Sequence, residues 1–217
     1  MPEISIVFPT ANRLAHLMRC VESVRKHLVG LSHEFVIVDG GSTDGTAEWL
    51  AEQDDVRLIQ HGGLLGSNKG FRDGLKAALG EYVCQLSDDI EVIDDCIPAA
   101  VELLKGDPTI GQVCFYYQNP GARPTQGFTH MFEAKVLFCC FGVTPRPVGE
   151  LVDWWSPEYY TQYGDPDFSC KIWQAGYRVA PLEGYCVLHH EADRPVELRK
   201  HYREDSAKYA AKWRQHG

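Results

Sequence analysis

The chain has 217 residues, a formal net charge of −9 at pH 7 and eight cysteines. With 44% hydrophobic and 24% charged residues, its composition is that of a soluble globular protein and excludes global disorder. Its apolar runs fall short of the roughly 20 residues that a membrane-spanning helix needs, and the N-terminus shows no secretory signal, so we expect no integral membrane segment.

The cysteines and the charge narrow the setting further. The cysteines have no CxxC spacing, which argues against a zinc site or a disulfide scaffold and favours a reducing, cytoplasmic location. Residues 194–217 hold seven basic and three acidic side chains, a local charge of +4, so the remaining 193 residues carry −13. An acidic body is a poor general nucleic-acid binder, although the basic tail leaves nucleic acid open as a partner.

The first half of the chain alternates between strand and helix patterns. Short β-branched or apolar runs predict strands over residues 4–8, 34–39, 56–59 and 81–86. Helical spacing predicts helices over residues 12–28, after Asp44, and over 71–79. Such alternation indicates βαβ units in a mostly parallel sheet, and ligands bind beyond the carboxyl ends of its strands. Thr10, Asp39 and the Asp88–Asp89 pair follow strand ends, so we expect them to converge on a site.

The second half is less regular. Its patterns predict helices over 92–105, 167–175 and 195–213, strands over 111–117, 134–141, 177–180 and 185–188, and a loop over 118–134. Repeats and clear linkers are absent from the sequence, so we expect one domain over residues 1–217.

Two short segments suit phosphate and metal chemistry. The segment from Val38 to Thr46 is a strand end, a glycine turn and a helix start, which suits an anion but also describes an ordinary capped turn. The adjacent carboxylates of Asp88 and Asp89 repel each other unless a cation or hydrogen-bond donors compensate, and Mg²⁺ binds few protein oxygens and completes its shell with phosphates and water. A loop with a helix cap is the alternative for this pair.

Four segments together resemble glycosyltransferase family 2, which has the GT-A fold. They are Ser5 to Thr10, Val38 to Thr46, Gly80-Glu81-Tyr82 and Leu86-Ser87-Asp88-Asp89-Ile90. Residues 163–179 also look like the acidic motif and helix of the family's second half, so the resemblance covers roughly residues 3–190.

The resemblance implies inverting transfer of a sugar from a nucleotide-diphosphate donor to an acceptor hydroxyl, within a single α/β domain. Residues 1–117 would form the nucleotide-sugar-binding half, 118–193 the acceptor and catalytic half, and 194–217 a basic C-terminal helix. Asp39 would contact the nucleobase, with Thr10 at the nucleotide and Asp88 near the ribose or sugar. Asp89 and His189 would bind Mn²⁺ or Mg²⁺.

The resemblance also places Asp165 as the general base. A carboxylate at a helix N-terminus stays ionised, which suits that role. Lys69 and Arg72 are candidates for binding the donor, with ordinary surface lysine and arginine as the alternative. The acceptor candidates are Asp167 and the aromatic pair Trp154–Trp155, whose rings stack on sugars or pack in cores.

Three positions depart from the family's pattern. Ser87 replaces the first aspartate of the metal motif, Asp73 replaces an asparagine of the donor-side helix, and Gly164 replaces a glutamate before the catalytic aspartate. The departures keep a non-catalytic nucleotide- or sugar-binding module as an alternative, beside a nucleotidyltransferase of similar fold. The donor (a UDP-, GDP- or dTDP-sugar), the acceptor (a glycan, a lipid-linked sugar or a modified DNA base) and the oligomeric state stay open.

Overall fold

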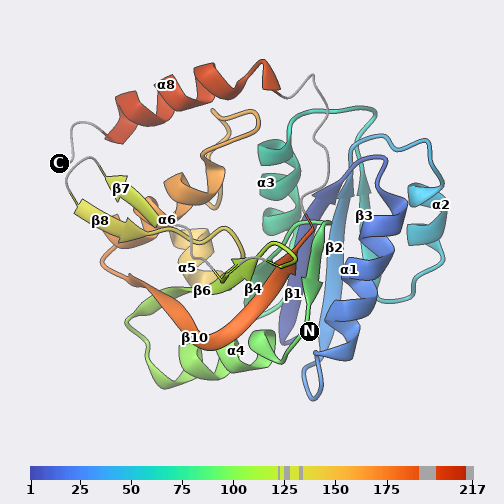
Figure 1. Ribbon diagram of the computed structural model, residues 1–217, viewed down its shortest axis with the longest axis horizontal. Helices are drawn as coiled ribbons and strands as arrows, with labels where there is room; N and C mark the ends of the chain where they lie inside the picture. Colours follow the sequence, from blue (N-terminus) through green and yellow to red (C-terminus); the bar gives the residue numbers. More distant parts are fainter. Residues whose placement is uncertain (122, 125–127, 132–133, 191–198, 214–217) are drawn as a thin grey trace.

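A computed structural model of the protein describes residues 1–121, 123–124, 128–131, 134–190 and 199–213. Within these residues, eight strands form one sheet in the order β3-β2-β1-β4-β9-β6-β10-β5, with helices on both faces (Figure 1). The strands of this sheet are β1 Ile4–Thr10, β2 His33–Asp39, β3 Val56–Gln60, β4 Tyr82–Gln85, β5 Ile90–Val92, β6 Ile110–Gln118, β9 Gly142–Pro145 and β10 Arg178–His189. The strands β7 Phe128–Met131 and β8 Ala134–Leu137 form a separate antiparallel pair. The helices are α1 Leu14–Lys26, α2 Thr46–Ala51, α3 Ser67–Ala77, α4 Cys96–Gly106, α5 Arg146–Leu151, α6 Gly164–Gln174 and α8 Tyr202–Trp213.

The sheet is parallel where the sequence alternates and mixed beyond it. Strand β1 pairs in parallel with β2 and β4, β2 pairs in parallel with β3, and β6 does so with β10. Strand β9 runs antiparallel between β4 and β6, and β5 runs antiparallel to β10. The predicted α/β class with a mostly parallel sheet is confirmed, with antiparallel strands added by the second half of the chain.

The alternation of side chains along β1 divides the core into two layers. Ile4, Ile6 and Phe8 pack in the cluster that contains the buried faces of α1 and α4, whereas Val7 packs with α3, α5 and α6 on the other face. Helix α3 lies close to the sheet because it carries glycines one turn apart. A Cβ atom at Gly70 would lie 2.7 Å from Cβ of Pro9, and one at Gly74 would lie 2.6 Å from Cγ1 of Val7.

The C-terminal helix α8 covers the second half of the chain. Figure 1 shows it on the outside of the molecule, at the end where α6 lies. Tyr209 and Trp213 of α8 form a small buried cluster with Tyr159 and Cys170. None of the helices in the described ranges combines the length and apolar character needed to cross a bilayer.

Several predicted boundaries are wrong, and long-range pairing explains them. The helix predicted over 92–105 begins only at Cys96, because Val92 belongs to β5, where Ile90 and Val92 are buried and pair with the end of β10. The predicted strand over 134–141 divides into β8 and the approach to β9, because Gln85 and Ser169 hold the backbone of Cys139 between them. The two predicted strands over 177–188 are one strand with a register shift between Pro181 and Cys186. The final helix begins at Tyr202, and residues 195–198 of its predicted span lie outside the described residues.

Candidate active site

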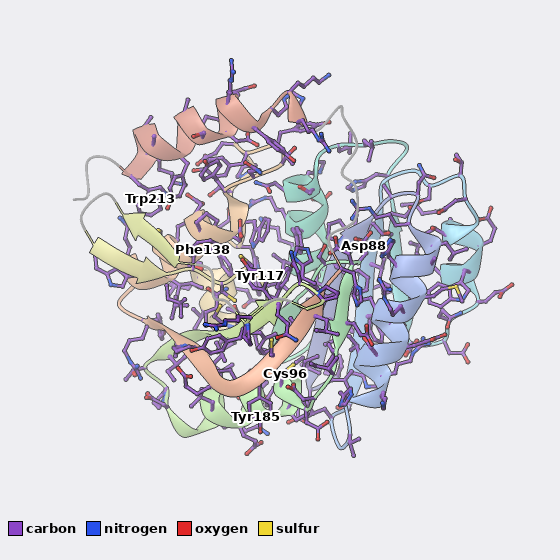
Figure 2. All side chains as sticks on the ribbon, in the orientation of Figure 1. Asp88, Cys96, Tyr117, Phe138, Tyr185 and Trp213 are labelled. Carbon is purple, nitrogen blue, oxygen red and sulfur yellow. The ribbon has the colours of Figure 1, made fainter. Side chains whose placement is uncertain are left out.

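A cavity of about 520 Å³ opens beyond the carboxyl ends of β1, β2 and β4, where an α/β sheet is expected to bind its ligand. Its lining includes Thr10 at the end of β1, Gly40 after β2, Asp88 and Asp89 after β4, His189 at the end of β10 and Asp165 at the start of α6. Figure 2 shows Asp88 and Tyr117, which also line the cavity, in the central part of the molecule. The structure therefore brings together residues that lie up to 179 positions apart.

The buried Asp88 carboxylate holds the centre of a polar network. Thr10 donates its hydroxyl to Asp88 Oδ2 at 2.8 Å, and Arg13 Nη1 donates to Asp88 Oδ1 at 2.9 Å. Burial raises the pKa of Asp88 above its usual range, while the Arg13 guanidinium acts in the opposite direction and the Asp89 charge adds to the rise. Arg13 also lies 3.6 Å from Asp89 Oδ2, so one guanidinium balances the charges of both adjacent carboxylates.

Asp89 and His189 lie next to this network and face each other. Nε2 of His189 lies 3.5 Å from Oδ1 of Asp89, and both residues line the cavity. The rings of Tyr117 and Phe141 pack edge-on against the imidazole at centroid distances of 5.9 and 5.5 Å, which fixes its plane. Among the described residues, Nδ1 of His189 is buried without a hydrogen-bond partner.

This pair fits a divalent cation that also binds a ligand's oxygens. A carboxylate oxygen and an imidazole nitrogen are ordinary ligands for Mn²⁺, and Nε2 of His189 faces Oδ1 of Asp89 at 3.5 Å. The part of the chain that the structure describes contains no group of three or more histidine, cysteine or acidic side chains that could hold a metal alone. A cation here would therefore depend on phosphate oxygens and water for the rest of its shell.

Asp39 lies at the rim of the cavity rather than on its lining. Its neighbours Val38 and Gly40 line the cavity, and the Asp39 carboxylate accepts hydrogen bonds from the backbone N–H and the hydroxyl of Ser42. These bonds fix the carboxylate at the end of β2, 2% exposed, in the glycine turn that the sequence predicted.

Asp165 lies in the first turn of α6 and lines the cavity. The turn before it is sharp, because Tyr163 adopts a left-handed conformation with φ of 68°. The helix dipole favours the ionised carboxylate at this position. Thr161, Gln162 and Tyr163 line the cavity as well, so the whole entry to α6 forms one wall.

Besides Asp39, four other predicted site residues do not line the cavity: Lys69, Arg72, Trp154 and Asp167. Lys69 pairs with Asp73 at 2.8 Å along α3, and Asp73 also bonds to His61. Arg72 bonds to the carboxylate of Asp153 at 2.8 Å and to the carbonyls of Asp153 and Trp155, so it holds the 153–155 loop instead of a donor.

Asp167 and Trp154, which were predicted on the acceptor side, are buried in the core instead. Asp167 is fully buried and accepts hydrogen bonds from Ser156, Tyr159 and Trp213, together with an ion pair to Lys212. Trp154 packs between Gly149 and Phe168 in the core. Both were expected on the acceptor side, and burial under α5 and α8 explains why they do not reach it.

Trp155 lines the cavity and accounts for the unusual glycine at position 164. Its indole stacks on Phe71 at a centroid distance of 4.3 Å. A Cβ atom at Gly164 would overlap the Trp155 ring, with Cζ3 only 2.6 Å away. The space where a glutamate side chain would begin is filled by Trp155, so Asp165 is the carboxylate that the α6 entry presents to the cavity.

Arg13 is the main site residue that the sequence analysis did not single out. It follows the same strand end as Thr10 and lies in the same loop, which was a usable signal. Its role as counterion to Asp88 depends on a contact 75 residues away along the chain, and no local pattern contains that information.

Comparison with known proteins identifies relatives of this chain. The sequence model described as Glycosyl transferase family 2 matches residues 5–163. The chain is 30% identical to the glycosyltransferase GlyG of Streptococcus pneumoniae over 125 residues, which are 54% of this chain and 41% of that protein. It is 27% identical to a dolichol-phosphate mannosyltransferase of Pyrococcus furiosus over 111 residues, 50% of this chain and 32% of that protein. The chain thus spans less than half the length of these curated relatives.

Two solved structures share the fold. The mannosyltransferase PcManGT of Pyrobaculum calidifontis, solved in complex with GDP-Man and Mn²⁺, superposes with a TM-score of 0.73 at 19% identity, over 100% of this chain and 65% of that one. TarS of S. aureus superposes with a TM-score of 0.75 at 15% identity, over 97% of this chain and 39% of that one. These likenesses confirm the predicted GT-A arrangement of the sheet and helices.

Proposed function

Because the chain belongs to glycosyl transferase family 2, we propose that it transfers a sugar from a nucleotide-diphosphate donor to an acceptor hydroxyl, with inversion and with the help of a divalent cation. The observation that carries the proposal is the meeting of Asp89 and His189 in the same cavity as Asp165. This supplies a metal-ligand pair and a candidate base within one site at the carboxyl ends of the strands.

The donor would lie along the strand ends. The nucleoside would bind near Thr10, which lines the cavity, and near Asp39, which lies beside the lining at the end of β2. The diphosphate would follow at the Asp88–Asp89 pair. Asp89 and His189 would hold Mn²⁺ or Mg²⁺, and the ion would stabilise the negative charge of the departing diphosphate.

Asp165 would act on the acceptor. As the acceptor oxygen forms its bond to the anomeric carbon, the hydroxyl proton moves to the Asp165 carboxylate, and the bond from that carbon to the diphosphate oxygen breaks with its electron pair. A single displacement of this kind inverts the anomeric configuration. Trp155 also lines this cavity, but its indole is almost fully buried and stacks on Phe71, so it shapes the wall and offers no free face to a sugar ring.

The free cysteines support a cytoplasmic location. All eight thiols are free, including the adjacent Cys139 and Cys140, which is the state that a reducing compartment maintains.

The test is release of nucleoside diphosphate from a panel of UDP-, GDP- and dTDP-sugars with Mn²⁺, without and with glycan and lipid-linked acceptors. GDP-mannose is the first donor to try, because the PcManGT structure contains it. We expect Asp165→Asn to lower kcat by about 10²–10⁴-fold with donor affinity retained. Asp89→Asn should abolish the Mn²⁺ dependence, and Asp54→Asn, which changes an exposed aspartate, is the matched control.

Three results would overturn the proposal. Release that survives both site variants would remove the assigned roles. Binding of nucleotide sugars without any release would favour a binding module. Formation of pyrophosphate from a nucleoside triphosphate and a sugar phosphate would favour a nucleotidyltransferase.

A further inference from the structure

The C-terminal helix α8 carries a fully buried carboxylate that binds three consecutive backbone amides. Asp205 accepts hydrogen bonds from the N–H groups of Tyr160 at 2.9 Å, Thr161 at 2.8 Å and Gln162 at 3.0 Å. Hydrogen bonds from several backbone N–H groups can offset the cost of burying a carboxylate. The three amides therefore compensate the charge of Asp205, and in return the carboxylate fixes the path of residues 160–162.

Helix α3 binds the carbonyl side of the same three residues. The carbonyl of Tyr160 accepts from the Asn68 N–H at 3.3 Å, that of Thr161 accepts from the Ser67 hydroxyl at 2.9 Å, and that of Gln162 accepts from the Asn68 side chain at 3.3 Å. The segment is thus held from both sides, by a side chain of α8 through its donors and by the start of α3 through its acceptors.

A second contact from α8 anchors the chain beyond Asp165. Lys212 Nζ lies 2.7 Å from Asp167 Oδ1, and Trp213 Nε1 donates to the same oxygen at 3.0 Å. Figure 2 labels Trp213 at the C-terminal end of α8. The two anchors reach residues 162 and 167, so Asp165 lies between them in sequence.

We propose that Asp205 is a positioning residue. Helix α8 sets the geometry of the cavity wall that carries Asp165, because it fixes residues 160–162 before Asp165 and Asp167 after it. This inference rests on the proposed role of Asp165 as general base. A displacement of about 1 Å at a reacting group can cost on the order of 10²-fold in rate. Loss of the Asp205 anchor should therefore act on turnover far more than on donor binding.

The experiment compares Asp205→Asn with the matched control Glu204→Gln, which changes an exposed neighbour on the same helix. An asparagine at position 205 keeps the size but loses the charge and one acceptor oxygen, so it cannot accept all three amide bonds. We expect amide hydrogen exchange at Tyr160, Thr161 and Gln162 to rise at least tenfold. We also expect kcat for donor turnover to fall by about 10- to 100-fold, while the donor Kd changes less than threefold.

A second pair of variants keeps the test informative if Asp205→Asn does not fold. Lys212→Met removes the charge from the anchor on Asp167, and the control Arg203→Met removes an exposed charge of the same helix. Only the first should lower kcat with donor Kd retained.

The outcomes separate the inference from the proposed function. If the unmodified protein turns over no donor, the proposed function fails. If it is active and both Asp205→Asn and Lys212→Met keep full kcat, or lose kcat only in parallel with donor affinity, the positioning role is refuted. Unchanged exchange at the three amides in Asp205→Asn would refute it as well.

Discussion

Replacing Gly164 with alanine tests whether Trp155 determines the glycine at the start of α6. The added Cβ would lie 2.6 Å from Trp155 Cζ3, closer still to Cε3, and 2.9 Å from Nδ2 of Asn68. Trp155 has little room to move, because it stacks on Phe71 and its side chain is almost fully buried. The clash is therefore expected to be relieved by strain in the core rather than by a shift of a flexible side chain.

The magnitude follows from two opposing effects. Overpacking a well-packed site costs about 1–3 kcal/mol, and alanine in place of glycine returns up to about 1 kcal/mol of helix propensity. We expect a net loss of about 1–2 kcal/mol in the free energy of unfolding. For a chain of this size, that loss corresponds to a fall of about 2–8 °C in Tm.

Urea denaturation of the variant measures this loss. The matched control is Gly106→Ala at the end of α4, where a Cβ atom would meet nothing within 4 Å. The smaller side chain of Trp155→Leu should relieve the clash. The double variant Trp155→Leu with Gly164→Ala should therefore lose about 1 kcal/mol less free energy of unfolding than the sum of the two single losses. If Gly164→Ala is as stable as Gly106→Ala, or the two losses simply add, the explanation of the glycine by Trp155 is wrong.

Three further predictions concern the cleft and the core. Arg13→Gln removes the counterion of the Asp88–Asp89 pair, so the two carboxylates should gain more from a bound cation. Mn²⁺ should therefore raise the Tm of this variant more than the Tm of the unmodified protein. An equal rise in a thermal-shift assay would contradict the role of Arg13 as counterion. Burial lowers the pKa of Lys171 to about 8 from 10.5, so the unfolded state binds more protons than the folded state between these pH values. The free energy of unfolding should therefore rise with pH across that window. Urea titrations at successive pH values should show this rise in the unmodified protein and not in Lys171→Met. Cys140 lines the cavity, whereas burial raises the pKa of Cys186, so a thiol reagent should modify Cys140 before Cys186. A nucleotide sugar bound in the cavity should protect Cys140 from the reagent. Peptide mapping that finds no such protection would exclude the cavity as the donor site.

The sequence was sufficient for the parallel half of the fold because local patterns decide it. Each early strand is a short apolar run, and Thr10, Asp39 and Asp88 end up at one sheet edge simply because parallel strands end there. The turn from Val38 to Thr46 was equally legible, since its glycines and its aspartate act on neighbouring residues.

The errors have both distant and local causes. Arg72 and Lys69 have the charge to bind a diphosphate, but Arg72 pairs with Asp153, 81 residues away, and Lys69 pairs with Asp73, one turn further along α3. Asp167 looked like a second acidic residue of the cleft because it is two positions from Asp165. On a helix two positions differ by roughly 200° around the axis, so Asp167 faces the opposite side, beneath α8.

The same distant contacts change how the basic tail is understood. Lys212 pairs with Asp167 and Glu158, and Lys208 pairs with Glu204, so both lysines are used within the protein. A nucleic-acid-binding helix needs its charges on a free face, where they can replace the counterions of phosphates. Lys212 instead contacts the entry of α6, so its charge is explained within the protein. Arg199, Lys200 and Arg203 are exposed, so the prediction of an external partner for this segment now rests on them and not on Lys212.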